Sequence, residues 1–367
     1  MLIKPSMLED YARGAAFLGS GGGGDPYYSF LLAQAASEKC GDFELMPVDE
    51  LPDEALVAPC GWIGAPTVSV EKLPNGKETV AGLKRLETVM GRKIDAVMPI
   101  EIGGGNGLAP LVAAAELGIP IIDADGMGRA FPESQMTILN IKGLYACPSV
   151  LTAACGATTV IETDDNHTHE RIARSLSVAL GGIAHMVEYP LTGAQVKTHA
   201  ITGSVSAAIA IGRAVSHARK DGQDPFLALG EALEKTSQYP HCKTIFDGKI
   251  CDLQRETSGG FSVGTATIKA LERNSIMRVQ FQNENLIALE DGKLKAVVPD
   301  IITIMDRESA DTITTERLKY GQRVKVVAAA APTMLRAQDA LKFVGPRAFG
   351  LNFDFHALEE LSSSEPL

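Results

Sequence analysis

The pattern of apolar and polar positions along residues 94–122 predicts a strand, a loop, a helix and a second strand. Residues 94–100 form a short apolar run, residues 108–117 have the length and Ala/Leu content of a helix, and residues 119–122 form a second apolar run. A right-handed crossover makes two such strands parallel. Glu101 and Asp123 each follow their strand directly, so we expect both at the carboxyl edge of the sheet, where open α/β sheets bind ligands.

The first 40 residues read as a helix, a glycine loop and a second helix. Residues 6–9 (Ser-Met-Leu-Glu) match a capping box for a helix ending near residue 17, and Asp25 with Pro26 reads as the N-cap and first residue of the next helix. The run at 19–24 formally satisfies GxGxxG, but a helix precedes it where a dinucleotide site needs a strand, and no Gly-Lys-Ser/Thr follows. We predict that Gly22, Gly23 and Asp25 contact a substrate.

The patterns further along the chain predict two domains. Residues 43–48 and 56–59 read as strands, residues 170–180 and 204–220 as helices, and residues 244–331 as short alternating strands with hairpin turns. We therefore predict an α/β domain with a mainly parallel sheet over residues 1–165, and an α+β domain over 166–367 that contains a small β-barrel or sandwich near 244–331. Residues 282–285 (Gln-Asn-Glu-Asn) interrupt the strand pattern, and we expect them to face the cleft between the domains.

Composition narrows the choice of partners. The chain has 367 residues, of which 45% are hydrophobic and 22% charged, and its net charge of −11 disfavours nucleic acid and anionic membranes. The first residues lack the features of a signal peptide, and no apolar run is long enough to span a membrane, so we expect a cytoplasmic protein, a homo-oligomer acting on a small molecule. Six scattered cysteines without a CxxC pair indicate neither a disulfide framework nor a zinc site, although Cys60 stays a candidate nucleophile.

Two polar clusters at the predicted sheet edge are the main candidates for a site. The glycines of residues 103–107, with Asn106, are expected to expose backbone N–H groups at a helix start, so we predict that Gly104, Gly105 and Asn106 bind substrate. The second cluster holds four charged candidates for catalysis and binding: Asp123, Asp125, Arg129 and Glu133. The alternative is structural, because glycine loops also turn corners and an Asp after a strand often caps a helix.

A third segment, residues 64–72, is expected to loop back towards the same edge. Glu71 and Lys72 at its end are further candidates for substrate binding. A solvated surface pair is the alternative for these two residues.

The motifs in this order resemble the S-methyl thiohydantoin desulfurase family. They are GSGGGGDP at 19–26, GAPTVSVEK at 64–72, EIGGGNGLAPL at 101–111, DADGMGRAFPE at 123–133, and the later FDGKI and PDIITIMD. The likeness covers nearly the whole chain. It implies two domains and a hydrolase that desulfurises an S-methyl thiohydantoin to a hydantoin with release of methanethiol. The family is also associated with hydantoinase and oxoprolinase-type proteins, which act on five-membered cyclic amides.

The implied reaction needs a base for water, donors for the developing charge, and a proton source for the departing sulfur. We assign Asp123 or Asp125 to activate water, Glu101 to handle the second proton, and Arg129 to neutralise a substrate carboxylate. Glu133 completes the catalytic set. No cofactor is expected, although a nucleophilic Cys or a divalent metal on Asp123 and Asp125 is an alternative route.

Two other functions fit the same motifs. An ATP-dependent hydantoinase-like subunit would use the two glycine loops to hold phosphates, although the phosphate-loop lysine is missing. A non-catalytic sensor of small anions would use the same donors and tolerate the loss of every carboxylate.

Overall fold

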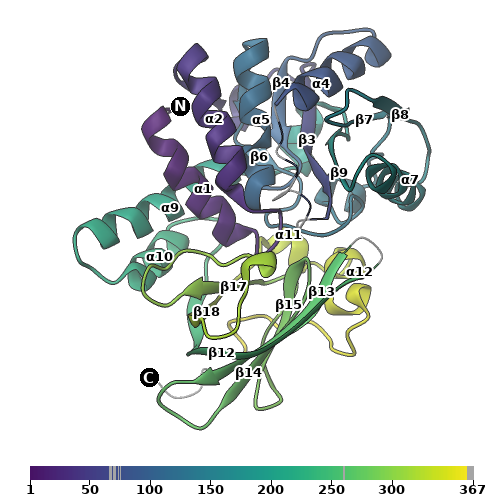
Figure 1. Cartoon of the computed structure of the whole chain (residues 1–367). Helices are drawn as coiled ribbons and strands as arrows, with labels where there is room; N and C mark the ends of the chain where they lie inside the picture. The colour runs from purple at the N-terminus through teal and green to yellow at the C-terminus, as the bar shows by residue number, and fades with distance from the viewer. Residues whose placement is uncertain (66–67, 69–71, 73, 75, 259–260, 362–367) are drawn as a thin grey trace.

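The computed structural model describes residues 1–65, 68, 72, 74, 76–258 and 261–361. Figure 1 shows an α/β part, in the upper half of the view, packed against a large antiparallel sheet in the lower half. The two parts share a core, since Phe17 and Leu18 of the first helix belong to the same buried cluster as Val327 and Ala329 of the lower sheet.

The α/β part is built on a mixed sheet with parallel strands at its centre. Within the described residues the strand order is β1-β2-β5-β4-β3-β9-β7-β8, with β10 paired to β3. Strands β2, β5, β4 and β3 are parallel neighbours, and antiparallel strands flank them on both sides. The strands are β1 (Leu2–Ile3), β2 (Phe43–Met46), β3 (Leu56–Gly64), β4 (Ala96–Pro99), β5 (Ile121–Ile122), β7 (Ser149–Thr152), β8 (Thr158–Ile161), β9 (Ile183–Val187) and β10 (Leu191–Thr192). The predicted α/β fold class and the parallel pairing around residues 94–122 are confirmed.

Most of the helices belong to the α/β part. The helices are α1 (Leu8–Leu18), α2 (Pro26–Cys40), α4 (Lys77–Met90), α5 (Gly104–Leu117), α6 (Ile138–Ile141), α7 (Asn166–Ala179), α8 (Gly193–His199), α9 (Ser204–Lys220) and α10 (Pro225–Glu234). Helix α10, in contrast, packs on α9 and on the first strand of the lower sheet. Asp25 caps α2 as predicted, because its Oδ1 accepts a hydrogen bond of 2.9 Å from Tyr27 N–H. The predicted capping box at Ser6 is wrong: Pro5 starts a 3₁₀ turn (Pro5–Met7), which places Ser6 inside the turn, and Met7 precedes α1 without a side-chain cap.

The chain after residue 165 contributes to both parts. Strand β9 lies between β3 and β7 in the α/β sheet, and α9 packs along α1. A small ladder joins β6 (Ala124–Asp125) to β11 (Ile201–Thr202), directly before α9. The last helices, α11 (Thr333–Arg336) and α12 (Leu341–Val344), contribute to a buried cluster with strands of the α/β sheet. The boundary at 165 stays a prediction.

The lower part is a curled antiparallel sheet, which confirms the predicted β-rich region (Figure 1). Its order within the described residues is β16-β15-β14-β13-β12-β18-β17. The strands are β12 (Cys242–Ser258), β13 (Phe261–Ala270), β14 (Ile276–Gln282), β15 (Glu284–Glu290), β16 (Lys293–Val297), β17 (Ile301–Asp306) and β18 (Arg323–Ala329). Asn283, with a φ of 60°, makes the turn from β14 into β15, at the sheet end that faces the α/β part.

Candidate active site

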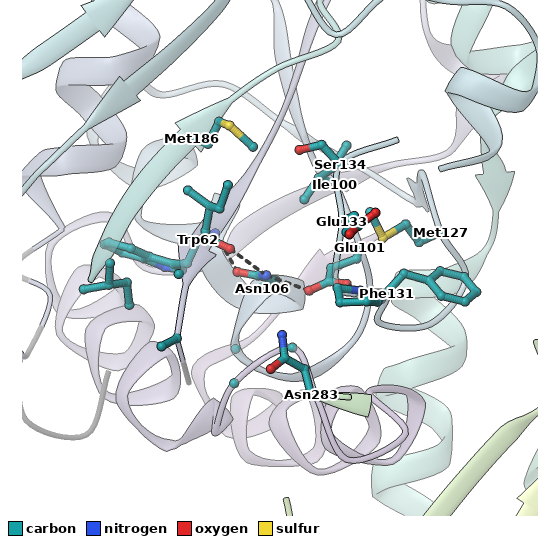
Figure 2. Close-up of a pocket in the computed structure, with 18 of the residues that line it drawn as sticks. Trp62, Ile100, Glu101, Asn106, Met127, Phe131, Glu133, Ser134, Met186 and Asn283 are labelled. Atoms are coloured by element: carbon teal, nitrogen blue, oxygen red, sulfur yellow. Dashed lines mark hydrogen bonds between the residues drawn. The ribbon is translucent and has the colours of Figure 1, made fainter. Parts of the chain in front are cut away.

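A cavity lies between the carboxyl ends of β3 and β4, helix α7 and the Asn283 turn of the lower sheet. Among the described residues, six acidic side chains line it, together with one cation and an apolar wall. The acidic residues are Asp25, Glu101, Glu133, Glu170, Glu188 and Glu284. Figure 2 shows side chains from both parts of the protein converging on this space, with Asn283 across from Asn106. The predicted position of residues 282–285 in the cleft is confirmed for Asn283 and Glu284.

Glu101 is held rigidly at the end of β4. It is 3% exposed, its Oε1 accepts a hydrogen bond of 2.6 Å from Asn106 Nδ2, and its Oε2 accepts one of 3.0 Å from the Phe131 backbone N–H. Asn106 is itself fixed, since its Oδ1 accepts from Trp62 N–H at 2.7 Å (Figure 2). Burial raises the pKa of Glu101 well above its usual range, and the nearby Glu284 raises it further. The neutral acid can donate a proton as well as accept hydrogen bonds.

The two glycine loops bind each other. The backbone N–H of Gly105 donates to Gly24 O at 3.0 Å, and that of Asn106 donates to Gly23 O at 3.3 Å. The expectation of bare N–H groups at the start of α5 is therefore wrong for these two residues, because the first glycine loop supplies their acceptors. Gly22 has no room for a side chain, since a Cβ there would lie 1.9 Å from Glu284 Oε1.

Glu133, Glu170 and Arg174 form the outer wall. Glu133 is half-buried and accepts a hydrogen bond from Gln135, while burial and the charge of Glu170 raise its pKa. Glu170 accepts a hydrogen bond of 2.9 Å from Ser134 N–H and one of 2.5 Å from Arg174 Nε. The Arg174 guanidinium also lies over the Phe261 ring at 4.5 Å, which joins α7 to β13 of the lower sheet.

Glu188 and Glu284 are two further acids that line the cavity, and they are deeply buried. Both are 2% exposed, and each has an Oε2 without a hydrogen-bond partner among the described residues. Burial raises the pKa of each to about 8, and in Glu284 the nearby Arg129 charge opposes this increase. At neutral pH Glu188 and Glu284 are therefore mainly protonated.

Apolar side chains form a further part of the cavity wall. Trp62, Ile100, Met127, Phe131 and Met186 line it, and Figure 2 shows them around the polar centre formed by Asn106 and Glu101. The ring of Trp62 contacts the buried His185 edge to face, with centroids 5.1 Å apart. A small ring with one polar edge and one apolar substituent suits such a cavity.

Family models match almost the entire chain. Residues 6–163 match the model described as "S-Me-THD-like, N-terminal domain", and residues 164–358 match the one described as "S-Me-THD-like, C-terminal domain". This chain belongs to the S-Me-THD-like family. The resemblance to S-methyl thiohydantoin desulfurases that the sequence motifs indicated is thereby confirmed at the level of the family.

A solved structure shares the fold of this S-Me-THD-like protein. It is a crystal structure of a protein from Chromobacterium violaceum, with a TM-score of 0.81, 23% sequence identity, and coverage of 98% of this chain and 100% of that one. At this identity the likeness shows the fold alone. A comparison with curated proteins found no match.

Asp123 and Asp125 of the S-Me-THD-like chain are not among the described residues that line the cavity. Asp123 Oδ1 accepts a hydrogen bond of 2.9 Å from Ser206 N–H in the first turn of α9. Asp125 is fully buried, and its Oδ2 accepts from three backbone N–H groups, those of Ile102, Met127 and Gly128, at 2.7–3.0 Å. Burial raises the pKa of Asp125 to about 6 against these hydrogen bonds. Both aspartates thus position backbone, the structural alternative that the sequence left open.

Arg129 joins the two parts of the protein. It is fully buried, and its guanidinium donates to the backbone oxygens of Ala130, Pro299 and Asp300 at 2.8–3.0 Å. The predicted contact with a substrate carboxylate does not fit this arrangement, because these carbonyls occupy Nε and Nη1, Nη2 faces Asn285 O at 3.4 Å, and Arg129 is not among the described residues that line the cavity. Within the part of the chain that the structure describes, the cation that lines the cavity is Arg174.

The remaining predicted residues divide between the cavity and its surroundings. Gly23, Asp25, Gly105 and Asn106 line the cavity, whereas Gly22 and Gly104 pack beside it. Asp25 also forms an ion pair with Arg317 of the lower part. Lys72 donates to Leu180 O at 2.9 Å, at the end of α7, and Glu71 lies outside the described residues.

Cys60 is not placed as a nucleophile. It is fully buried in the main core on β3, and burial raises the pKa of its thiol far above the usual range. Metal ligands are also not gathered anywhere in the described residues: no group of three or more His, Cys, Asp or Glu side chains is arranged to hold an ion. In the same part of the chain, no helix is both long and apolar enough to cross a membrane.

The sequence patterns did not indicate Glu170 or Glu188 as site residues, and they placed Glu284 only at the cleft. Glu188 had a signal, because it directly follows the apolar run 183–187, the same pattern that singled out Glu101. Glu170 had none, since an acidic residue in a helix is usually a solvated one. Only the packing of α7 against the sheet turns it towards the cavity.

Proposed function

We propose that this protein is a hydrolase that converts an S-methyl thiohydantoin to a hydantoin and releases methanethiol. The observation that carries the proposal is Glu101, a buried carboxyl group fixed by two donors inside a cavity with one apolar wall. Membership of the S-Me-THD-like family supports the same chemistry. The apolar wall suits the methylthio group, and the carboxyl groups suit the N–H and C=O groups of the ring.

The first half of the reaction is the addition of water to the ring carbon that bears sulfur. Glu133 is the base, because it is the half-buried acid of the cavity and its raised pKa brings it closer to neutral pH. Glu101, neutral because of its burial, gives a proton to the adjacent ring nitrogen as the C=N electron pair moves there. Asn106 keeps Glu101 in place throughout. These roles replace those that the sequence suggested for Asp123 and Asp125.

The two alternative functions fit the site less well. A phosphate cradle needs free backbone N–H groups, but those of Gly105 and Asn106 are bound by the other glycine loop. A sensor of small anions needs positive charge, and among the described lining residues Arg174 is a single cation beside six acids, itself paired with Glu170.

The test is turnover by the purified protein. A panel of S-methyl thiohydantoins and of plain hydantoins is incubated with it, and mass spectrometry detects the ring product and the trapped thiol. We expect equal amounts of methanethiol and hydantoin from at least one S-methyl compound and no opening of plain hydantoins. Folded protein that releases no thiol from any member of the panel, with or without ATP, would contradict the proposal.

A further inference from the structure

A second polar chain lies behind the cavity. Glu188 directly follows β9 and lines the cavity, and its Oε2 is 3.9 Å from Nδ1 of His169 on α7. His169 Nε2 is in turn 2.7 Å from Oγ of Ser149 on β7. All three side chains are buried, and neither Glu188 Oε2 nor His169 Nδ1 has a hydrogen-bond partner among the described residues.

This series has the members of a Ser-His-acid triad, but the ends are exchanged. In a nucleophilic triad the serine faces the substrate and the acid lies behind the histidine. Here Ser149 is fully buried and does not line the cavity, whereas the acid, Glu188, does. In this arrangement the group that can reach a substrate is therefore the Glu188 carboxyl, and the Ser149 hydroxyl cannot act as a nucleophile.

We propose that Glu188 is the acid that protonates the departing sulfur, and that His169, oriented by Ser149, is a positioning residue that stabilises the carboxylate left behind. This inference rests on the proposed function and completes its second half. A neutral histidine can face a carboxylate favourably only through an N–H at Nδ1. Its Nε2 must then accept the hydrogen bond from the Ser149 hydroxyl. The Ser149 hydroxyl can donate this bond, so it supports the tautomer that Glu188 needs once it has lost its proton.

The atoms balance over the whole reaction. As the tetrahedral intermediate collapses, the C–S bond breaks, its electron pair goes to sulfur, and the Glu188 proton follows to give methanethiol. The hydroxyl on the same carbon becomes the carbonyl and loses its proton to Glu101, which had protonated the ring nitrogen. The proton that Glu133 took from water passes to Glu188. One water is consumed, and each carboxyl group returns to its starting state.

The groups around Glu188 favour its protonated form at rest. Burial raises its pKa to about 8. A hydrogen bond with Ser134 opposes this increase, and the charge of Glu170 on α7 adds to it. Cys147 and Tyr189 also face it, and burial raises the pKa of both, so they are neutral. Burial lowers the pKa of His169 to about 4, which keeps the imidazole neutral and able to act as a donor without carrying charge.

The experiment compares two leaving groups. The substrates are an S-methyl thiohydantoin and its S-(2,2,2-trifluoroethyl) analogue, whose thiolate is a much weaker base and leaves without help from an acid. We expect Glu188→Gln to lower kcat/KM about 100-fold or more for the methyl compound and less than about tenfold for the fluorinated one. Equal losses for both compounds would make Glu188 a structural residue and overturn the inference.

A matched pair of histidine variants tests the positioning role. Removal of the donor in His169→Phe should raise the pKa of Glu188, and so move the alkaline limb of kcat/KM for the methyl compound to higher pH. His185 is the control, because it is equally buried and neutral but has no carboxyl partner among the described residues. His185→Phe should leave the limb and the ratio of the two substrates unchanged. A limb that moves equally in both variants would contradict the role of His169.

The wild-type protein alone gives a further test that needs no variant. Its kcat/KM for the methyl compound should decline as the pH rises through about 8, while that for the fluorinated compound should not. Parallel declines would overturn the inference even if Glu188→Gln does not fold. A protein that turns over neither compound would instead refute the proposed function, on which the inference rests.

Discussion

Two acidic loops leave the same sheet and have very different surroundings. Glu101 follows β4 and lines the cavity, whereas Asp123 and Asp125 follow β5 and bind backbone N–H groups away from it. Their sequence contexts are alike, an apolar run followed by an acid and then glycines. The difference shows that a carboxylate at a strand end is available for chemistry only where neighbouring backbone donors do not surround it.

The number and origin of the donors separate the two loops. Three backbone N–H groups converge on a single oxygen of Asp125, which fixes the turn that follows β4 to the turn that follows β6. Glu101 receives one backbone donor and one side-chain donor, on different oxygens, and its longer side chain reaches the cavity. Side-chain length is therefore part of the distinction, because Asp at 101 would fall short by one methylene group.

The largest expected effect is on turnover, through Glu101→Gln. The amide cannot give up a proton and can accept from only one of its two present donors, so kcat/KM for an S-methyl thiohydantoin should fall about 100-fold to 10,000-fold. Steady-state kinetics with detection of methanethiol measures this. A thermal melt serves as the control, since the lost hydrogen bond should cost only about 1 kcal/mol of folding free energy. Turnover near that of the wild type would remove Glu101 from the mechanism.

The second effect is on stability, through Asp125→Ala. The change leaves three buried N–H groups without their acceptor, so the free energy of unfolding should fall by about 3 kcal/mol. Asp125→Asn is the matched variant, because its amide oxygen can still accept, and we expect a smaller loss. Chemical denaturation measures both. A loss of turnover in fully folded Asp125→Asn would return this loop to the catalytic site.

The fold was predictable because its signals are local. Alternation within residues 244–331 and the apolar runs at 94–100 and 119–122 depend on neighbouring residues, and the structure confirms both regions. The cap formed by Asp25 is local in the same way. Glycine loops at 19–24 and 103–107 were also recognised as unusual, but their mutual binding joins segments about 80 residues apart in the chain, which no local pattern records.

The site was predictable only in part, because its other members come from distant segments. Glu101, Glu133 and Asn106 were named from their position near a sheet edge. Glu170, Glu188 and Glu284 reach the cavity through the packing of α7, β9 and β15. The predicted role of Arg129 in substrate binding does not fit for a similar reason. Its hydrogen-bond partners, Pro299 and Asp300, are distant in the chain and belong to the other part of the protein.

The third effect is a pH dependence of stability that the acidic cavity imposes. Burial raises the pKa of Glu188 and Glu284 to about 8, so the folded protein keeps two protons that the unfolded chain loses near its ordinary value of 4.5. Their stabilisation is complete below that value and declines as the pH rises to about 8. His169 and His185, with pKa values lowered to about 4 and 3, have the opposite dependence, but only below about pH 6.5.

Between about pH 6.5 and 8, therefore, the free energy of unfolding should fall by about 1 kcal/mol per pH unit for each glutamate. Urea denaturation at several pH values measures the slope. Glu188→Gln should make the slope shallower, whereas a change at the exposed Glu44 should leave it as it is. Stability that is constant or increases over this interval would show that these carboxyl groups are ionised in the folded protein.

The smallest expected effect belongs to Asp123→Asn. Asn is also a good cap, and its side-chain oxygen can accept the Ser206 N–H in place of the carboxylate, so stability should change by less than about 0.5 kcal/mol. Turnover should stay within about twofold of the wild type, because Asp123 does not line the cavity. Asp123→Ala, which cannot cap, should cost about 1 kcal/mol with the same small effect on turnover. Near-complete loss of turnover in folded Asp123→Asn would mean that both acidic loops serve the reaction, and the distinction between them would fail.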